Sequence, residues 1–455
     1  MNTDDTIAAI ATAPGPAGIA VVRLSGPHAL AVADRIFQTR GAKPSQRAAG
    51  SFTVGHVMRG DERIDRALLL IMRAPNSYTG EDVVELQGHG GGVCARRILR
   101  CALDAGARSA GPGEFTQRAF LNGRLDLVQA EAVLDLIHAR SDRAAAAALD
   151  QLEGGLSPAF DALYTGLIQL AADLEATLDF PEEELPEAVM TELVDRSGRL
   201  CDHINRLLDT WDEGHWLRDG ALVVISGKPN VGKSTLLNGL LGRERAITSP
   251  TPGTTRDTIE EDLVIHGIPI RLIDTAGLRD SDCHIEQNGV ERTKASMARA
   301  DLHLHLLDAT QPLDPADTDQ LSRLPTDRTI LLINKYDLTN TDYRIASGHH
   351  SLQISALQDI SIERVKEAIR ELLAQRISLS ARPHAAISER HRGLLVVAGH
   401  EMQAAVALLK EGRENQVPQA ADHLRGAIDQ IGSVTGKVYQ DELLNTIFSR
   451  FCIGK

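Results

Sequence analysis

The chain has 455 residues, of which 43% are hydrophobic and 24% are charged, and its formal net charge is −14. This length predicts about two to four domains, and the composition is that of a globular protein rather than a disordered one. The acidic balance argues against a protein that coats nucleic acid nonspecifically, although a local basic groove could still hold RNA.

The cysteines and the apolar runs indicate the cellular compartment in which the protein works. The five cysteines are odd in number and form no Cys-x-x-Cys pair, so neither a disulfide framework nor a structural zinc site is indicated. The N-terminus "MNTDDTIAAIATAPGP" is acidic, and its apolar run is too short for a signal peptide. No apolar run approaches the roughly 20 residues that span a bilayer. We expect a cytoplasmic protein without a membrane partner.

Residues 1–118 mix short strands with helices. The runs "GIAVVRLSG", "RALLLIMRAP" and "EDVVELQGHGGG" predict strands, and "GVCARRILRCALDAG" predicts a helix. This pattern indicates an α+β domain.

The predicted secondary structure of the rest of the chain changes twice, from helical to alternating strands and helices and back to helical. Residues 119–217 are rich in Ala and Leu at helical spacing, and residues 379–455 have the same helical character. Between them, residues 218–378 alternate strands and helices, which is typical of a parallel α/β sheet. We expect one helical domain split by an inserted α/β domain. The acidic run at 180–187, which contains two prolines, predicts a solvated loop rather than a metal site.

A glycine-rich loop follows the first strand of the inserted domain. Gly227-x-x-x-x-Gly232-Lys233-Ser234 lies between the apolar run 222–225 and a helical run. The glycines let backbone N–H groups turn toward a phosphate, Lys233 reaches the β- and γ-phosphate oxygens, and Ser234 binds Mg²⁺. The residues expected at the nucleotide are Gly227, Asn230, Val231, Gly232, Lys233, Ser234 and Thr235.

A second motif selects the base. In "LLINKYD", Asn334, Lys335 and Asp337 follow a strand that reads as buried. A carboxylate at Asp337 can accept hydrogen bonds from guanine N1–H and the exocyclic amine, donors that adenine does not present in that pattern. We expect Lys335 to lie along the base, and Ser355 and Ala356 of "ISAL" to close over guanine O6. GTP is therefore the predicted nucleotide.

Two further segments complete the motifs of a GTPase. "IRLIDTAG" supplies Asp274 as an indirect Mg²⁺ ligand and Gly277 at the γ-phosphate, with Thr275 and Ala276 between them. "GTTRD" supplies a threonine for Mg²⁺, for which Thr255 is the first choice and Thr254 the second.

One expected residue is missing. Ras-like GTPases carry a water-orienting Gln directly after the D-x-x-G glycine, and that position is Leu278 in this chain. Asn230 could instead hold a monovalent cation beside the phosphates, and Glu286 is a candidate to orient water through a second water. Taken alone, Glu286 would more simply be interpreted as a solvated carboxylate at a helix start.

The motifs together resemble one family. "DTIAAIATAPGPAGIAVVRLSG", "SYTGEDVVELQGHGG", "GPGEFTQRAFLNGRLDLVQAEAVLDLI", the GTPase loops and the terminal "FCIGK" are similar to the MnmE (TrmE) tRNA modification GTPases. The resemblance implies an N-terminal folate-binding and dimerisation domain, and a helical domain split by an inserted Ras-like P-loop GTPase domain. It also implies that a homodimer works with the flavoprotein MnmG (GidA). Together they would install an aminomethyl or carboxymethylaminomethyl group on C5 of the wobble uridine of certain tRNAs.

The resemblance also implies ligand contacts. Arg23, Glu85, Arg124 and Lys455 match positions that contact a tetrahydrofolate derivative (5-formyl- or methylene-tetrahydrofolate), and Arg124 departs from the family's frequent Lys. A pterin edge resembles that of guanine, so Glu85 can pair with it. For K⁺, the matching positions are Asn230, Ser249, Thr251 and Thr254.

The C-terminal tail remains open to two interpretations of its thiol. The resemblance implies that the tail docks against the folate-binding domain, where Phe448 and Phe451 would be buried and Lys455 would reach the ligand. Cys452 could act on the uridine as a nucleophile or could be a small packing residue.

Two alternatives compete with these interpretations. A GTPase switch in ribosome assembly would share the GTPase motifs but commonly has a basic RNA-binding appendage. His303 and His305 share one strand face and could be metal ligands, although no third ligand is evident.

Overall fold

The computed structural model describes residues 4–178, 187–242, 260–274, 298–339, 348–376, 386–411 and 416–455. The chain forms two compact units. The first unit comprises Met1–Leu134, Ser157–Thr165 and Ile428–Lys455, and the second comprises Asp135–Leu156 and Gly166–Ala427. The predicted loop at 180–187 lies, but for its last residue, outside the described residues, so it stays a prediction.

The first unit is built on a seven-stranded sheet of order β3-β4-β5-β6-β2-β1-β7. Its pairings are antiparallel except for β1 with β7. The strands are β1 (Ile7–Ile10), β2 (Ile19–Ser25), β3 (Phe37–Thr39), β4 (Phe52–Arg59), β5 (Glu62–Met72), β6 (Val83–His89) and β7 (Arg108–Ser109). All three runs that predicted strands in this region are confirmed.

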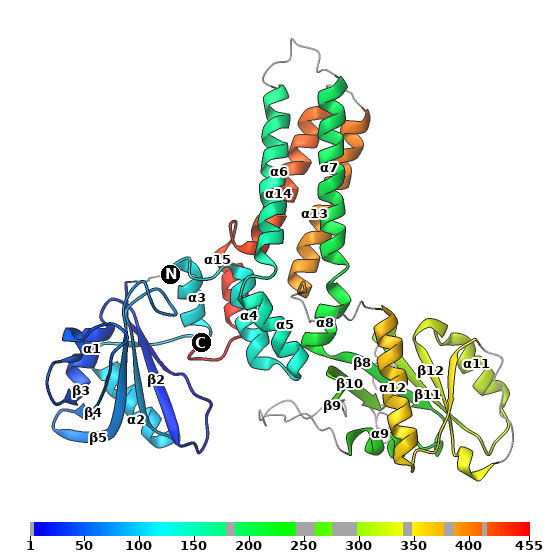
Figure 1. The fold of residues 1–455 in the computed structure, drawn as a ribbon, viewed down its shortest axis with the longest axis horizontal. Coiled ribbons are helices and arrows are strands. Elements are labelled where there is room, and N and C mark those ends of the chain that lie inside the picture. Colours follow the sequence, from blue (N-terminus) through cyan, green and yellow to red (C-terminus); the bar gives the residue numbers. More distant parts are fainter. Residues whose placement is uncertain are drawn as a thin grey trace, which may run out of the picture. The chain divides into compact units, whose positions relative to one another are not determined.

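Two helices cover one face of this sheet (Figure 1). They are α1 (Ala29–Ile36) and α2 (Gly92–Asp104), and the second is the helix that the sequence predicts. Alternate residues of β2 and β6, such as Leu24 and Leu86, point into the apolar core that α1 and α2 complete. The intervening residues, Arg23 and Glu85 among them, therefore lie on the opposite, open face.

Helices follow the sheet along the chain. They are α3 (Glu114–Leu121), α4 (Leu127–His138), α5 (Asp142–Leu152), α6 (Ser157–Leu178), α7 (Glu187–Leu208), α8 (Trp211–Asp219), and, after the inserted domain, α13 (Glu389–Glu411), α14 (Val417–Thr435) and α15 (Asp441–Phe448). The prediction of helices on both sides of the insertion is confirmed.

Ion pairs join the long helices of the second unit, which Figure 1 shows running side by side. Arg196 of α7 contacts Asp173 of α6 at 2.5 Å. Arg425 of α14 contacts Glu175 of α6 at 2.7 Å. These pairs are largely exposed, so apolar packing rather than charge stabilises the bundle.

Helix α13 bears on the expectation that no apolar segment of the chain is long enough to span a membrane. It is long and apolar enough to do so by length and composition, with a mean hydropathy of 1.2 over an 18-residue window. Its buried residues recur every three or four positions, which is typical of a helix that packs one face into a bundle. They are His391, Leu395, Ala398, Met402, Ala405 and Leu409.

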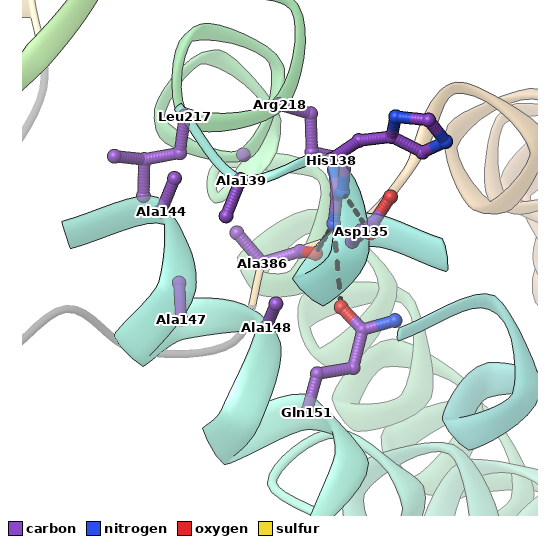
Figure 2. A pocket seen from close by; sticks show the side chains of 11 residues that line it. Asp135, His138, Ala139, Ala144, Ala147, Ala148, Gln151, Leu217, Arg218 and Ala386 are labelled. Carbon is purple, nitrogen blue, oxygen red and sulfur yellow. Dashed lines mark hydrogen bonds and ion pairs between the residues drawn. The ribbon is translucent and has the colours of Figure 1, made fainter. Parts of the chain in front are cut away.

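Arg218 ties the end of α8 to three other segments of the second unit, around a cavity of about 40 Å³ that Figure 2 shows. Its guanidinium donates to Asp135 of α4 at 2.7 Å, to the carbonyl of Ile387 at 2.7 Å and to the carbonyl of Ala386. Gln151 of α5 accepts at 3.4 Å. Because α8 leads directly into the inserted domain, Arg218 fixes the start of that domain to the helices.

The inserted domain is a six-stranded sheet of order β13-β12-β11-β8-β10-β9. Its strands are β8 (Ala221–Gly227), β9 (Glu260–Ile265), β10 (Ile268–Asp274), β11 (Leu302–Asp308), β12 (Thr329–Asn334) and β13 (His350–Gln353). Five are parallel as predicted, whereas β9 runs antiparallel to β10. The two are joined by His266 and Gly267, both at positive φ, which is the geometry of a tight hairpin.

Helices cover both faces of this sheet. Helices α9 (Lys233–Leu241) and α12 (Asp359–Arg376) share its main apolar core, which also holds Trp216 of α8. Helix α11 (Pro315–Arg323) packs Leu321 against Leu307 and Leu331, which lie on β11 and β12.

Candidate functional site

The inserted domain brings its motifs to one edge of the sheet. Strand β8 ends at Gly227, β11 at Asp308, β12 at Asn334 and β10 at Asp274. Register confirms that the ends meet, since Leu306 pairs with Gly227 and Asp308 with Asn334. In an open α/β sheet, ligands bind outside the carboxyl ends of the strands.

Backbone geometry explains the glycines of the phosphate loop. Gly227 has a φ of 139°, and a Cβ there would lie 2.5 Å from the carbonyl oxygen of Leu306. Gly232 has a φ of 102°, and a Cβ there would lie 2.2 Å from Nδ2 of Asn334. Asn230 also has a positive φ, 63°, which Asn tolerates better than most residues. The loop therefore needs these residue types to close.

Lys233 lies inside the loop. Its Nζ donates to the carbonyl of Gly227 at 3.0 Å and to that of Lys228 at 2.7 Å. Val231 is buried behind it, whereas Ser234 and Thr235 are exposed in the first turn of α9. The amino terminus of α9 and these two hydroxyls are thus open to an anion and its metal ion, and the predicted contacts to phosphate and Mg²⁺ stay predictions.

One support of the loop was missed by sequence reasoning. Nζ of Lys228 contacts Asp314 at 2.5 Å and Asp317 at 2.8 Å. These two aspartates form the capping box at the start of α11. The signal was present in "LDPAD", since an acidic residue followed by Pro and another acid marks a helix start.

Asn334 holds the two halves of the site together. Its Nδ2 donates to the carbonyl of Val231 at 2.7 Å, and its Oδ1 accepts from the amide of Ala356 at 2.9 Å. The amide of Ser355 in turn donates to Oγ of Ser361 at 3.1 Å. Asn334 therefore positions the phosphate loop and the 355–356 loop by hydrogen bonds.

The residues that we expect at the guanine base come directly after Asn334 in the sequence. Lys335 has a φ of 62° and its Nζ contacts Asp308 at 2.6 Å, while Asp337 is exposed in the short helix η3 (Tyr336–Leu338). Burial opposes ionisation of Asp308, but Lys335 and Thr310 outweigh it, so the pKa of Asp308 lies below its ordinary value. Asp308 was missed by sequence reasoning, although it ends a buried strand beside the motif.

Several predicted residues lie outside the described residues. For Asp274 the structure describes the backbone position at the end of β10, beside Ile225 of β8. The rest of the cation, switch and water-orienting set stays a prediction: Ser249, Thr251, Thr254, Thr255, Thr275, Ala276, Gly277, Leu278 and Glu286.

The two histidines of β11 lie under the site. His305 shares a 2.9 Å hydrogen bond with Oγ of Ser226, and both histidines are buried. Burial lowers the pKa of His303 and of His305 to about 4. Within the part of the chain that the structure describes, no cluster of three potential metal ligands occurs. The neutral rings serve as core residues of the sheet.

A second candidate site lies on the open face of the N-terminal sheet. Arg23 of β2 and Glu85 of β6 are directly opposed, and Nε of Arg23 lies 2.9 Å from Oε1 of Glu85. The guanidinium also lies 5.7 Å from the ring centroids of Tyr78 and Phe115. Neither aromatic residue was singled out from the sequence. The cluster combines a half-buried carboxylate, a guanidinium and two aromatic rings.

The C-terminal tail docks beside this cluster. The amide of Gly113 donates to the carbonyl of Cys452 at 3.4 Å, and the amide of Phe115 donates to that of Lys455 at 3.2 Å. Phe448 and Phe451 are buried, and Gly454 sits so close to Ile10 that a Cβ would lie 2.4 Å from its carbonyl oxygen. The predicted docking of the tail is confirmed.

The tail brings Lys455 to the Arg23–Glu85 pair. Burial lowers the pKa of the Lys455 ammonium, the positive charge of Arg23 lowers it further, and Glu85 opposes the shift. Arg124 is exposed and lies against Gly80, in the loop that also supplies Tyr78. Cys452 is exposed in this chain, so both interpretations of its thiol stay predictions.

A network of ion pairs around the buried Arg118 holds this region in place. Arg118 of α3 contacts Asp5 at 2.5 Å and Glu81 and Glu114 at 3.2 Å each. Arg108 contacts Glu114 at 2.6 Å. The network joins the start of β1, the loop before β6 and the helix that carries Phe115, and so fixes the elements around Arg23.

The chain matches two family models. Residues 6–124 match the N-terminus of the GTP-binding protein TrmE, and residues 127–452 match the MnmE helical domain. Among solved structures, Era from Aquifex aeolicus bound to GDP·AlF4⁻ is 27% identical over 40% of this chain and 67% of its own, with a TM-score of 0.26 that is too low to bear on the fold.

Curated relatives match over their full length. The tRNA modification GTPase MnmE of Alkaliphilus metalliredigens is 42% identical over 463 residues, which cover 100% of both chains. That of Symbiobacterium thermophilum is 44% identical, over 99% of this chain and 100% of its own. With its phosphate loop and base-recognition loops at one sheet edge, the chain is a GTP-binding hydrolase and belongs to the MnmE family of tRNA modification GTPases.

Proposed function

We propose that this GTPase depends on K⁺ and acts with the flavoprotein MnmG in the cytoplasm. Together they would add an aminomethyl or carboxymethylaminomethyl group to C5 of the wobble uridine of certain tRNAs. A tetrahydrofolate derivative would supply the carbon. The membership in a tRNA modification family supports this role and gives no support to a switch in ribosome assembly.

The placement of Lys455 beside Arg23 and Glu85 carries the folate part of the proposal. Folates end in carboxylates and present a pterin edge of N–H donors. Glu85 offers an acceptor for that edge, and two neighbouring cations, Arg23 and Lys455, offer partners for anionic groups. The rings of Tyr78 and Phe115 give flat surfaces against which a pterin ring can stack.

The N-terminal sheet also supports homodimer formation. Its open face carries large exposed apolar residues at Ile19, Phe52 and Val54, which are 59%, 70% and 51% exposed. Arg23 and Glu85 lie on the same face, because they alternate with core residues along their strands. A second subunit that covers this face would bury the apolar residues and enclose the folate cluster.

The phosphate loop supports the K⁺ part of the proposal. Asn230 is exposed and held at positive φ, so its side-chain oxygen is available to a cation near the β- and γ-phosphates. A cation there stabilises charge that develops in the transition state, a role that an arginine finger has in other GTPases. Ser234, and Thr255 beyond the described residues, would hold Mg²⁺.

Calorimetric titration with 5-formyltetrahydrofolate tests the folate site. We expect the wild-type dimer to bind and the Glu85→Ala variant to lose binding by about 100-fold, since two hydrogen bonds to a charged acceptor disappear. Asp61→Ala, an exposed carboxylate in the turn of the same sheet, serves as the control and should bind normally. Undiminished binding by Glu85→Ala would contradict the proposed site.

Hydrolysis in KCl and NaCl at equal ionic strength tests the cation. Because Na⁺ is smaller and holds its water more tightly, we expect turnover to fall at least about tenfold in NaCl, and the Asn230→Ala variant to be slow in both salts. Equal wild-type rates would remove the cation from the mechanism.

A further inference from the structure

The outer surface of α2 faces the β4–β5 hairpin across a groove of about 330 Å³. We call it the arginine groove. Its lining is four arginines and two apolar residues: Arg59, Ile64, Val93, Arg96, Arg97 and Arg100. None of these side chains takes part in either site described above.

Positive charge exceeds negative charge in this groove. Arg59 lies 2.8 Å from Asp104, and Arg100 lies 3.8 Å from the same carboxyl group. Arg97 pairs with Glu62. Two carboxylates thus face four guanidinium groups. Their pairs are solvent-exposed and therefore weak, so an incoming anion can replace them at little cost.

Arg96 is the least neutralised member. It is exposed, and no ion pair to it occurs within residues 4–178, 187–242 and the other described ranges. Arg96 and Arg100 are one helical turn apart on α2, with about 5–6 Å between their Cβ atoms. Two guanidinium forks at this spacing can bind neighbouring phosphates of one strand, each by two parallel hydrogen bonds.

The groove contrasts with the chain as a whole. A net charge of −14 repels a nucleic acid, so a tRNA can approach only where the local field is positive. The apolar side of α2 packs Ala95, Ile98 and Cys101 into the domain core, which holds the helix rigid. The exposed Val93 and the half-buried Ile64 offer apolar contacts to ribose edges between the charges.

We propose that the arginine groove binds the ribose–phosphate backbone of tRNA. For its substrate, this inference rests on the proposed function. An acidic protein partner is the less suitable occupant, because the groove offers no enclosed apolar pocket for an anchoring side chain. Since α2 covers the face of the sheet opposite to Arg23 and Glu85, RNA in the groove leaves the folate cluster accessible.

Salt-dependent binding of an unmodified tRNA transcript to the full chain tests the proposal. Arg96→Glu with Arg100→Glu should weaken binding by roughly 10-fold to 100-fold. The slope of log K against log salt should become shallower by about 1.5, because two phosphate contacts are lost. Arg40→Glu with Lys43→Glu changes the net charge equally at exposed positions of the same domain and is the matched control. GTP hydrolysis should be unchanged in both variants.

The outcomes separate the groove from the proposed function. Equal tRNA affinity in the wild type and the groove variant, or an equal loss in the control, would overturn the groove. Retained tRNA affinity with loss of the copurifying flavoprotein would show a protein surface instead and would also overturn it. Wobble-uridine modification in cells that carry the wild-type chain is a separate readout. Its absence there would contradict the proposed function and not the binding of RNA.

Discussion

The nucleotide site and the proposed folate cluster, which comprises Arg23, Tyr78, Glu85, Phe115 and Lys455, are assembled in different ways. Every described contact of the nucleotide site joins residues between Gly227 and Ser361, and most involve a backbone atom. The folate cluster joins side chains of β2 and β6 to the last residue of the chain. The phosphate loop is shaped largely by its own backbone and is joined to the base-recognition loop through Asn334. The folate cluster, by contrast, is complete only when the last residue of the chain docks beside β2 and β6.

This difference predicts which mutations will impair each site. A loop that binds through N–H groups tolerates changes in the rest of the molecule, provided that its glycines keep their positive φ. A site completed by a docked tail depends on the hydrogen bonds of Gly113 and Phe115 to that tail. Mutations far from the ligand should therefore affect the folate cluster more than the nucleotide site.

Removal of the tail should give the largest difference between the effect on the folate cluster and the effect on the nucleotide site. Deletion of residues 452–455 removes Lys455 and both backbone hydrogen bonds, so we expect wobble-uridine modification to fall more than about 100-fold. GTP hydrolysis should stay within about twofold of wild type. Mass spectrometry of tRNA nucleosides and a phosphate-release assay measure the two activities.

Two single variants resolve what the tail contributes. Lys455→Ala keeps the backbone bonds and should lose folate binding without loss of docking. Cys452→Ser tests the exposed thiol, and full modification activity in that variant would exclude catalysis by sulfur. A truncated protein that still modifies tRNA would contradict the dependence on the tail.

The Asp337→Asn variant should impair the nucleotide site and leave the folate cluster intact. We expect this carboxylate to accept two hydrogen bonds from guanine. Because bonds to a charged group contribute about 1.5–3 kcal/mol each, GTP affinity should fall about 100-fold or more. Xanthosine triphosphate, which has a carbonyl in place of the exocyclic amine, should bind this variant better than GTP does. Asp327→Asn, an exposed change in the same domain, is the control. An unchanged GTP affinity would place base recognition elsewhere.

The nucleotide site could largely be predicted from the sequence. A phosphate loop between a strand and a helix, and an N-K-x-D motif after a buried strand, carry their geometry in adjacent residues. The structure adds what neighbours contribute, such as Asp308 beside Lys335 and the helix cap that binds Lys228. Those partners come from other strands and loops, where spacing in the sequence does not fix distance.

The residues of the proposed folate cluster could be singled out only through the family resemblance. Nothing in the pattern of "VVRLSG" shows that Arg23 faces Glu85, because strand order and register are set by the packing of the whole sheet. The ring of Tyr78 reaches Arg23 from a loop whose shape depends on buried pairs to Arg118. The antiparallel β9 was missed because edge strands pair on one side only, and the pattern does not fix their direction.

The Arg218→Ala variant tests whether the nucleotide site is independent of the helices that Arg218 ties to the inserted domain. The variant removes the hydrogen bonds that Arg218 donates to Asp135 and to two backbone carbonyls, which should lower the free energy of unfolding by about 2–3 kcal/mol. GTP affinity should remain within about threefold, because no residue of the loop contacts Arg218. Urea denaturation followed by tryptophan fluorescence measures the change, with the exposed Arg323→Ala as the control. A large loss of GTP affinity would show that the loop needs the helical support.

The smallest effect should be a difference in acid sensitivity between the two regions. His303 and His305 are neutral in the folded sheet, with pKa values of about 4 against an ordinary 6.5. Their contribution is complete above pH 6.5 and declines as the pH falls toward 4, because the unfolded chain then binds more protons. Between pH 7.5 and 5.5, each should lower the free energy of unfolding by about 1–1.5 kcal/mol. In the N-terminal domain, hydrogen bonds to Arg108 lower the pKa of Asp5 from 3.8, so that pair is not lost until the pH is lower still.

The two tryptophans make this difference measurable. Both lie on α8, and Trp216 is part of the core of the inserted domain, so urea midpoints from tryptophan fluorescence report on that region. We expect His303→Leu to reduce the change in midpoint between pH 7.5 and 5.5, and the exposed His350→Gln to leave it unchanged. Because the carboxylates of the N-terminal network protonate only at lower pH, their loss cannot mimic the result. An acid sensitivity that persists in His303→Leu and in a matching His305 variant would assign it to other groups.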